Sequence, residues 1–284
     1  MILITGASGN IGSEVLRQAA AARLEVRAGY QSPDKAARSP AGVDTVVMDY
    51  TRPETIRRAL EGIATLFLVG PPTRDVAELE GNVVRECARA GVAHIVKLSA
   101  LGGRGATFPS LHRDSEERIE ASGIAWTFLR PNGFMQNFVT YSGHTIQTQN
   151  VFYAAQGNGA VSHVDVRDVG AAAVRVLSER GHEGRAYALT GPEALTNEQI
   201  AGILSRVSGR EIRYVDLPPA ELRKALVGAG MPEWSADALL DLQRLYREGG
   251  ATRVEGSVEH LTGRRPTGFE PFARDHATAW QARS

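Results

Sequence analysis

Three glycines near the start of the 284-residue chain are spaced as a phosphate-binding turn requires. The run Gly6-Ala7-Ser8-Gly9-Asn10-Ile11-Gly12 follows the apolar residues 2–5 and precedes a helical pattern through Val15, Leu16 and Ala19. In such a strand, turn and helix, the first glycine allows the tight turn, and the second lets backbone N–H groups approach a pyrophosphate. The third lets the helix pack on the strand. The alternative is an ordinary strand-to-helix turn. We expect a dinucleotide to contact Gly6, Ser8, Gly9, Asn10, Ile11 and Gly12.

The elements that must position this turn continue the same alternation. Strand-like runs recur along the first half, and each leads into a helical pattern. Ser32-Pro33 and residues 51–54 have the composition of helix starts, the second as a capping box with an early proline. Strands that alternate with helices predict a parallel sheet covered on both faces. The expected strands cover 25–30, 45–48, 65–69, 93–98 and 125–129.

The second half of the chain alternates less regularly. We expect residues 1–130 to form a doubly wound, Rossmann-type α/β domain and residues 131–284 to form a smaller, interleaved α/β lobe that binds the substrate. Parts of 151–190 are expected to rejoin the first sheet. The predicted strands here are 151–155, 161–166, 187–190 and 212–217, and helices are expected to start near Asp168, Thr196 (in a capping box with Gln199), Pro218 and Pro232.

Composition limits the classes of partner. Lys and Arg number 32 and Asp and Glu number 32, so the formal net charge is zero, which argues against nucleic acid and anionic membranes as partners. No apolar run approaches about 18 residues, and no secretory leader pattern is present. The single cysteine, Cys87, cannot form an internal disulfide, and we interpret it as a small core residue rather than a nucleophile. We expect a cytoplasmic protein with a small-molecule partner, and a homo-oligomer remains open.

The glycine motif after Thr5 resembles that of the short-chain dehydrogenase/reductase superfamily. Members of that superfamily carry a Tyr-x-x-x-Lys pair on one helix, where the i, i+4 spacing lets the lysine lower the pKa of the tyrosine that donates the proton. Residues 120–131 resemble the end of that helix, the turn and the strand ending in Arg-Pro. Counting back places His112 at the lysine position and Phe108 at the tyrosine position. Phe108 cannot donate a proton, so the pair is absent.

This departure narrows the resemblance to the NmrA-like group of atypical members. Segments 5–12, 122–137 (with Leu-Arg-Pro-Asn-Gly-Phe-Met-Gln-Asn) and 164–169 carry it. The resemblance implies an NAD(P)H-dependent reductase that transfers a hydride to an apolar conjugated acceptor such as a quinone or dye. Such acceptors delocalise the added charge, so a tyrosine donor is less necessary, and the protein mainly orients the two rings. The alternative is a non-catalytic NAD(P)-binding redox sensor that binds a protein partner.

The end of the second strand selects the dinucleotide, because an acid there accepts from a ribose 2′-hydroxyl and a base pairs with a 2′-phosphate. Gln31 stands there, where the family commonly has arginine. Gln31 and Ser32 can bond a phosphate and Lys35 can reach it, which favours NADP(H) with NAD(H) as the alternative. The alternative for Lys35 is a solvated helix residue. Asp49 is either an acceptor from the adenine amino group or a cap or turn residue. The expected cofactor-binding set is completed by Val69, Gly70, Pro71, Ser99 and Pro131.

His112 and Ser99 are the candidates for catalytic residues. The imidazole would hold the nicotinamide ribose or the substrate, or supply a proton near neutral pH, unless it is a surface or capping residue. The resemblance places Ser99 near the nicotinamide, and the alternative is a strand-end cap. His112 and Glu116 have the i, i+4 spacing of two metal ligands, but no third ligand is spaced nearby, so no metal is expected. The acceptor pocket is expected to be floored by Phe134, Met135 and Phe138, for which core packing is the alternative.

Overall fold

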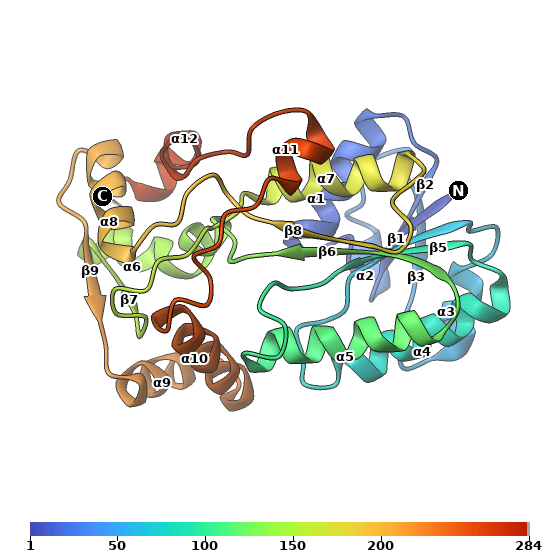
Figure 1. Cartoon of the computed structure of the whole chain (residues 1–284), viewed down its shortest axis with the longest axis horizontal. Helices are drawn as coiled ribbons and strands as arrows, with labels where there is room; N and C mark the ends of the chain where they lie inside the picture. The colour runs from blue at the N-terminus through green and yellow to red at the C-terminus, as the bar shows by residue number, and fades with distance from the viewer. Residues whose placement is uncertain (283–284) are drawn as a thin grey trace. The chain divides into compact units, whose positions relative to one another are not determined.

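The computed structural model describes residues 1–282, which divide into two compact units (Figure 1). The first unit comprises residues 1–100, 111–130 and 166–188. The second comprises residues 101–110, 131–165 and the described residues from 189 onward. The chain therefore passes from one unit to the other several times, and each unit is assembled from segments that lie far apart in the sequence.

A seven-stranded sheet in the order β3-β2-β1-β4-β5-β6-β8 forms the centre of the first unit. The pairings along the series from β3 to β6 are parallel, as predicted, and the strand order reverses direction between β1 and β4. Ligands of such sheets bind at the carboxyl ends of the strands beside this reversal. The strands are β1 (Ile2–Ile4), β2 (Val26–Tyr30), β3 (Asp44–Val47), β4 (Thr65–Leu68), β5 (His94–Leu98), β6 (Ala125–Pro131) and β8 (Arg185–Leu189).

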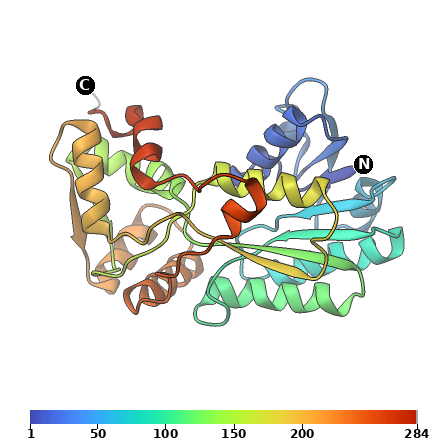
Figure 2. The same cartoon turned by 45° about the horizontal axis from the view of Figure 1, so that its top comes forward.

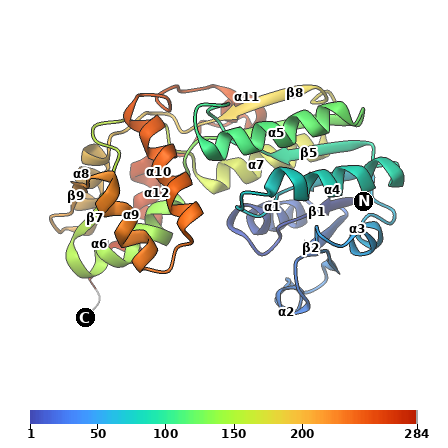
Figure 3. The ribbon, with the colours of Figure 1, turned by 90° about the horizontal axis from the view of Figure 1, so that it is seen from below.

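Helices cover both faces of this sheet, which completes the predicted doubly wound α/β fold (Figures 1 and 3). The pair α1 (Asn10–Ala21) and α7 (Val166–Ser178) packs together on one face. The other face carries α3 (Pro53–Ala59), α4 (Val76–Ala90) and α5 (Thr107–Ala121), and the short α2 (Pro33–Ala36) follows β2 as predicted. Cys87, a residue of α4, is completely buried in the core, and burial raises the pKa of its thiol to about 12. It is a core residue, as expected.

Two local predictions are wrong. The capping box at 51–54 does not form, because both the backbone N–H and the hydroxyl of Thr51 donate to Asp49; Arg52 occupies the N-cap position instead. Residues 161–166 are not a continuous strand. They make only isolated bridges, since Val161 pairs with Leu195 and Val164 with Phe134, and α7 already begins at Val166.

The second unit contains a two-stranded parallel sheet of β7 (Val151–Ala154) and β9 (Arg213–Asp216), flanked by helices (Figure 2). The residues of β7 thus pair with β9 rather than with the large sheet; within 151–190, α7 and β8 rejoin the first unit. The predicted capping box between Thr196 and Gln199 is confirmed. The other elements are η1 (Phe138–Ser142), α6 (Gly143–Gln149), α8 (Asn197–Ser208), α9 (Pro219–Gly228), α10 (Glu233–Arg247), α11 (Ser257–Thr262), α12 (Phe269–Asp275) and η2 (Ala277–Trp280).

The length and hydropathy of these helices show whether any of them could span a membrane. Through residue 282, none of them combines the length and the apolar character needed to cross a bilayer.

Gly12 fixes how closely α1 approaches the turn that precedes it. A Cβ atom built on Gly12 would overlap the carbonyl oxygen of Gly6, and that oxygen belongs to the backbone and cannot rotate away. Any side chain at this position must therefore push the first turn of the helix off the glycine loop.

We expect Gly12→Ala to lower the free energy of unfolding by about 3 kcal/mol, at the upper end of the range for overpacking. Urea unfolding of the variant measures this. The matched control is Gly228→Ala in α9, where a new Cβ meets nothing within 4 Å. The control is expected to be neutral or to gain up to about 1 kcal/mol. Equal stability of the two variants would contradict the steric argument.

Candidate active site

The glycine turn presents backbone donors at the carboxyl end of β1. Gly6 has a positive φ of 63°, and the N–H of Gly9 donates to the Gly6 carbonyl at 2.8 Å, which closes the turn. Within residues 1–282, the N–H groups of Asn10, Ile11 and Gly12 donate to no acceptor. These groups form the first turn of α1, where the helix dipole adds partial positive charge. The residues of the motif thus place free backbone donors together at the end of β1, and their binding of a dinucleotide stays a prediction.

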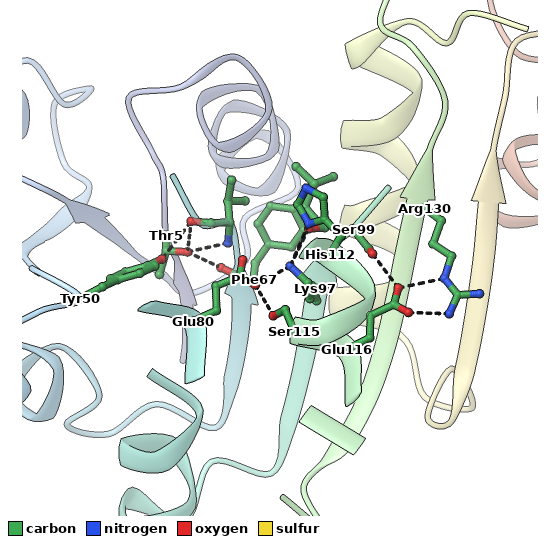
Figure 4. Close-up of polar contacts among 12 residues, drawn as sticks. Thr5, Tyr50, Phe67, Glu80, Lys97, Ser99, His112, Ser115, Glu116 and Arg130 are labelled. Atoms are coloured by element: carbon green, nitrogen blue, oxygen red, sulfur yellow. Dashed lines mark hydrogen bonds and ion pairs between the residues drawn. The ribbon is translucent and has the colours of Figure 1, made fainter. Parts of the chain in front are cut away.

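Thr5 links this turn to the end of β4. Its hydroxyl donates to the carbonyl of Phe67 at 3.0 Å and accepts from the N–H of Val69 at 2.9 Å (Figure 4). The Tyr50 hydroxyl donates to the Val69 carbonyl at 2.9 Å, and Asn82 in turn donates to the Tyr50 carbonyl. The segment expected to contact the cofactor after β4 is therefore held beside the glycine turn by side-chain bonds as well as by the sheet.

The residues expected to select the dinucleotide come together after β2. Lys35 Nζ donates to Gln31 Oε1 at 3.3 Å, and both side chains are exposed. Ser32 is the N-cap of α2, but its side chain makes no capping bond, so its hydroxyl is not used by the helix. Asp49 differs, since Thr51 donates to it twice, and these bonds lower the pKa of its carboxyl. Asp49 thus has turn contacts, and its contact with adenine stays a prediction.

A completely buried ion pair lies beneath the carboxyl ends of β4 and β5. Lys97 Nζ in β5 contacts Glu80 Oε2 in α4 at 2.6 Å, and both side chains have 0% exposure. The Ser115 hydroxyl donates to the same carboxylate oxygen. Lys97 Nζ also donates to the Leu98 carbonyl at 3.2 Å. Gly70 leaves room for this carboxylate, because a Cβ there would lie 2.6 Å from Glu80 Oε1.

His112 is the third group that contacts this lysine. Its Nδ1 lies 3.3 Å from Lys97 Nζ, and Figure 4 shows Lys97 between Glu80 and His112. An ammonium group has only donors, so Nδ1 accepts and the ring proton is on Nε2. Burial, and then the positive charge of Lys97, lower the pKa of His112 to about 3. The imidazole is therefore neutral at pH 7 and is not a surface histidine.

Glu116 anchors the helix that carries His112. Its carboxylate is 1% exposed and accepts two bonds from Arg130, at 2.8 and 2.7 Å, one from Ser99 at 2.6 Å and one from Arg113 at 2.7 Å. Burial alone would raise the pKa of Glu116, but these hydrogen bonds outweigh it and leave the pKa below its usual range. The hydroxyl proton of Ser99 is thus committed to Glu116, and α5 is fixed to the ends of β5 and β6.

The predicted residues that fall in the second unit have mainly packing contacts. Phe108, at the former tyrosine position, packs edge-to-face on Trp234 at 5.6 Å. Met135 is 1% exposed and Phe138 contacts Phe152 and Phe269, so both belong to the core, whereas Phe134 is half-buried. Pro131 ends β6 and is buried. In the described residues, no three His, Cys, Asp or Glu side chains gather as a metal site.

The sequence-based prediction missed Lys97 and Glu80. Both carried a signal, since Lys97 interrupts the otherwise apolar strand Ile95–Leu98, and Glu80 occupies an apolar-stripe position of α4 between Ala77 and Val83. Charged residues are almost never fully buried unless they are paired. Two such exceptions in neighbouring elements would have predicted an ion pair.

Comparison with known proteins identifies the family of this chain. A family model described as NAD(P)H-binding matches residues 6–180, and the chain belongs to this NAD(P)H-binding family. An NAD(P)H azoreductase of Xenophilus azovorans is 36% identical over 99% of this chain and 100% of the relative. A (4-alkanoyl-5-oxo-2,5-dihydrofuran-3-yl)methyl phosphate reductase of Streptomyces griseus is 37% identical over 99% of each chain.

A solved structure shows the same architecture over the whole chain. The NADPH-dependent quinone oxidoreductase QOR2 of Escherichia coli, complexed with NADPH, superposes with a TM-score of 0.89 at 30% identity. The match covers 98% of this chain and 100% of that one. The predicted resemblance and the predicted fold class are both confirmed.

The buried pair makes a prediction about stability. Lys97→Met alone leaves a buried carboxylate unpaired, and Glu80→Gln alone leaves a buried ammonium, so each is expected to cost about 3–5 kcal/mol. The double variant removes both charges and is expected to recover most of that loss. Urea unfolding of all four proteins gives the coupling energy. The exposed pair Arg223–Asp237 is the control and should show far weaker coupling. Additive losses at Lys97 and Glu80 would contradict the assignment.

The contact with Lys97 also makes a spectroscopic prediction for His112. Histidine ¹⁵N spectra should show its ring in the Nε2–H form and uncharged from pH 8 down to pH 5, because a proton on Nδ1 would face the ammonium group. An exposed histidine ordinarily titrates near pH 6.5. The signals are assigned by their loss in His112→Gln. Protonation of His112 above pH 5, or a proton on Nδ1, would contradict the contact.

Proposed function

We propose that this protein is an NADPH-dependent reductase that transfers a hydride to a neutral or cationic conjugated acceptor of the quinone, azo or dye type. The relatives described above are named reductases or oxidoreductases, which confirms the predicted enzyme class. The alternative of a non-catalytic sensor has only the missing Tyr-x-x-x-Lys pair in its support, and the reductases among the relatives favour the enzyme.

The observation that carries the proposal is the set of three N–H groups at the start of α1. Among the described residues, the backbone N–H groups of Asn10, Ile11 and Gly12 have no acceptor, and Gly9 adds no side chain to the turn that a pyrophosphate would approach. The residues present therefore fit a dinucleotide. When bound, it supplies the hydride, and the protein binds and orients it.

The choice of NADPH rests on the end of β2. Lys35 and Gln31 contact each other there, and neither Gln31 nor Ser32 is the acid that a 2′-hydroxyl would favour. The QOR2 structure similar to this chain holds NADPH, which agrees with this preference. NAD(H) remains the weaker alternative in the proposal.

The acceptor class rests on what the relatives share. An azo group, a quinone and a dihydrofuranone with an adjacent acyl group are all conjugated electrophiles that spread the incoming charge. The absence of a tyrosine at Phe108 is compatible with such acceptors, as it would not be with a simple ketone. A cytoplasmic location and a small-molecule partner are parts of the same proposal. The lone, buried Cys87 accords with a reducing compartment.

We expect the wild type to consume NADPH over many turnovers with at least one member of a panel of quinones, azo compounds and triphenylmethane dyes. Gly9→Val, which places a branched side chain at the turn, should reduce NADPH affinity and turnover by at least about 100-fold, since it blocks several phosphate bonds. Nicotinamide absorbance measures turnover and fluorescence titration measures affinity. Full activity of Gly9→Val, or NADPH binding by the wild type without consumption, would contradict the proposal.

A further inference from the structure

A neutral quinone or azo group must take up a proton as well as a hydride, and the proposed function leaves the source of that proton open. Phe108 occupies the position at which related enzymes carry a tyrosine, and a phenyl ring has no proton to give. Ser99 is nine-tenths buried and its proton is committed to Glu116. Another group of the protein must therefore supply the proton. This inference rests on the proposed function.

His112 lies on the side of the sheet edge that the nicotinamide half of a dinucleotide would reach. The residues that select the adenosine half follow β2, on one side of β1, so the nicotinamide half extends toward β4 and β5 on the other side. The register Ile4–Phe67–Val96 aligns the carboxyl ends of β1, β4 and β5. His112 contacts Lys97, the residue after Val96, at this same edge.

The hydrogen bonds around Lys97 leave one direction for a proton to move. Glu80, the Leu98 carbonyl and His112 Nδ1 take up the three protons of the ammonium group. On the far side of the ring, Nε2–H has no acceptor among the described residues, and the histidine is only partly buried. The imidazole thus contacts the buried ammonium group through Nδ1 and leaves its Nε2–H free to donate to a ligand.

We propose that Lys97 and His112 form a proton relay that protonates the reduced acceptor. The hydride bonds to one carbonyl oxygen of a quinone, the ring becomes aromatic, and the π electron pair of the other carbonyl moves onto its own oxygen. That oxygen takes the proton of His112 Nε2, while Nδ1 takes a proton from Lys97 Nζ. The quinone is reduced to the hydroquinone and NADPH is oxidised to NADP⁺. Lys97 is left as an amine. After the product leaves, Nε2 takes one proton from the solvent as the Nδ1 proton returns to Lys97, which restores the ammonium group.

Glu80 and Ser115 have positioning roles in this relay. The Glu80 carboxylate contacts Lys97 Nζ at 2.6 Å and so orients it toward His112, and the Ser115 hydroxyl donates to the same carboxylate oxygen. A neutral imidazole alone is a poor acid. Coupled to an ammonium group it transfers a proton without ever becoming an imidazolium ion, which agrees with its strongly lowered pKa.

The test compares two acceptors that differ in their need for a proton. A quinone takes up a hydride and a proton, whereas a triphenylmethane cation becomes neutral with the hydride alone. His112→Gln keeps an N–H donor but cannot relay a proton, so its kcat should fall by about 100-fold or more with the quinone, relative to its kcat with the dye. Lys97→Met/Glu80→Gln should show the same selective loss. His144→Gln, at an exposed histidine of α6, is the matched control.

Two further measurements separate the relay from a structural role. NADPH affinity of each variant, from fluorescence titration, shows whether the cofactor site is intact. The ¹⁵N spectrum of His112 in Lys97→Met/Glu80→Gln, which needs no turnover, should lose the fixed Nε2–H form because the ammonium group is gone. An unchanged Nε2–H form in that variant would overturn the relay.

The activities with the quinone and with the dye together test the relay. Equal losses with the quinone and the dye, or no loss with the quinone, overturn the relay while leaving the proposed reductase intact. A wild type that reduces the cation but not the quinone also overturns the relay. If the wild type reduces the quinone but not the dye, a 100-fold loss in His112→Gln with NADPH affinity retained supports the relay, and a rate within twofold of wild type overturns it. A wild type that reduces neither overturns both.

Discussion

A lysine and a glutamate with no exposure to water face each other beneath the carboxyl edge of the central sheet. Removing two charges from water is costly, and only good geometry and further hydrogen bonds compensate for it. The Lys97 ammonium group has three acceptors, and Glu80 Oε2 accepts from Lys97 and Ser115, whereas Glu80 Oε1 has no partner among the described residues. The pair joins β5, α4 and α5, so the elements that surround the proposed nicotinamide end of the site depend on one electrostatic contact.

Glu116, one helical turn after His112 in α5, is a second buried charge that is compensated by hydrogen bonds. Its buried carboxylate is satisfied by two arginines and a serine, so α5 is tied to β5 and β6 by charge-assisted bonds rather than by apolar packing alone. The carboxyl edge thus combines free backbone donors at the glycine turn with buried side chains that are held by hydrogen bonds. Fold alone does not define a function, and it is these particular groups that support a reductase.

The parts of the fold that depend on local signals could be predicted from the sequence. The glycine turn, the alternating strands and helices and the capping box at Thr196 each lie within a few consecutive residues. Partners distant in sequence were harder. The apolar run at 151–155 is a strand, but nothing in it indicates that its neighbour is β9. Thr51 has the right spacing for a cap, yet Asp49 competes for its hydroxyl.

The candidate site divides in the same way. The backbone donors of the site follow from the spacing of the glycines. The buried side chains depend on how α4 packs against β5, which brings together Glu80 and Lys97, 17 positions apart. His112 could be found by counting back from the Arg-Pro strand, but its lowered pKa could not, because the pKa depends on burial in the folded structure and then on the charge of Lys97. Met135 and Phe138 match an apolar pocket and a core equally well in sequence, and the structure packs them in the core.

The interleaved order of the two units limits how the gene can be cut. A fragment ending at residue 130 would contain the glycine turn and six strands of the sheet, but it would lack β8 and α7, which arrive from residues 166–188. Strand β6 would then become an open edge, and α1 would lose the helix that packs along it. Exposed edges and apolar helix faces favour aggregation. A fragment that keeps the whole first unit must therefore extend to residue 188, and it then also carries residues 131–165 of the second unit.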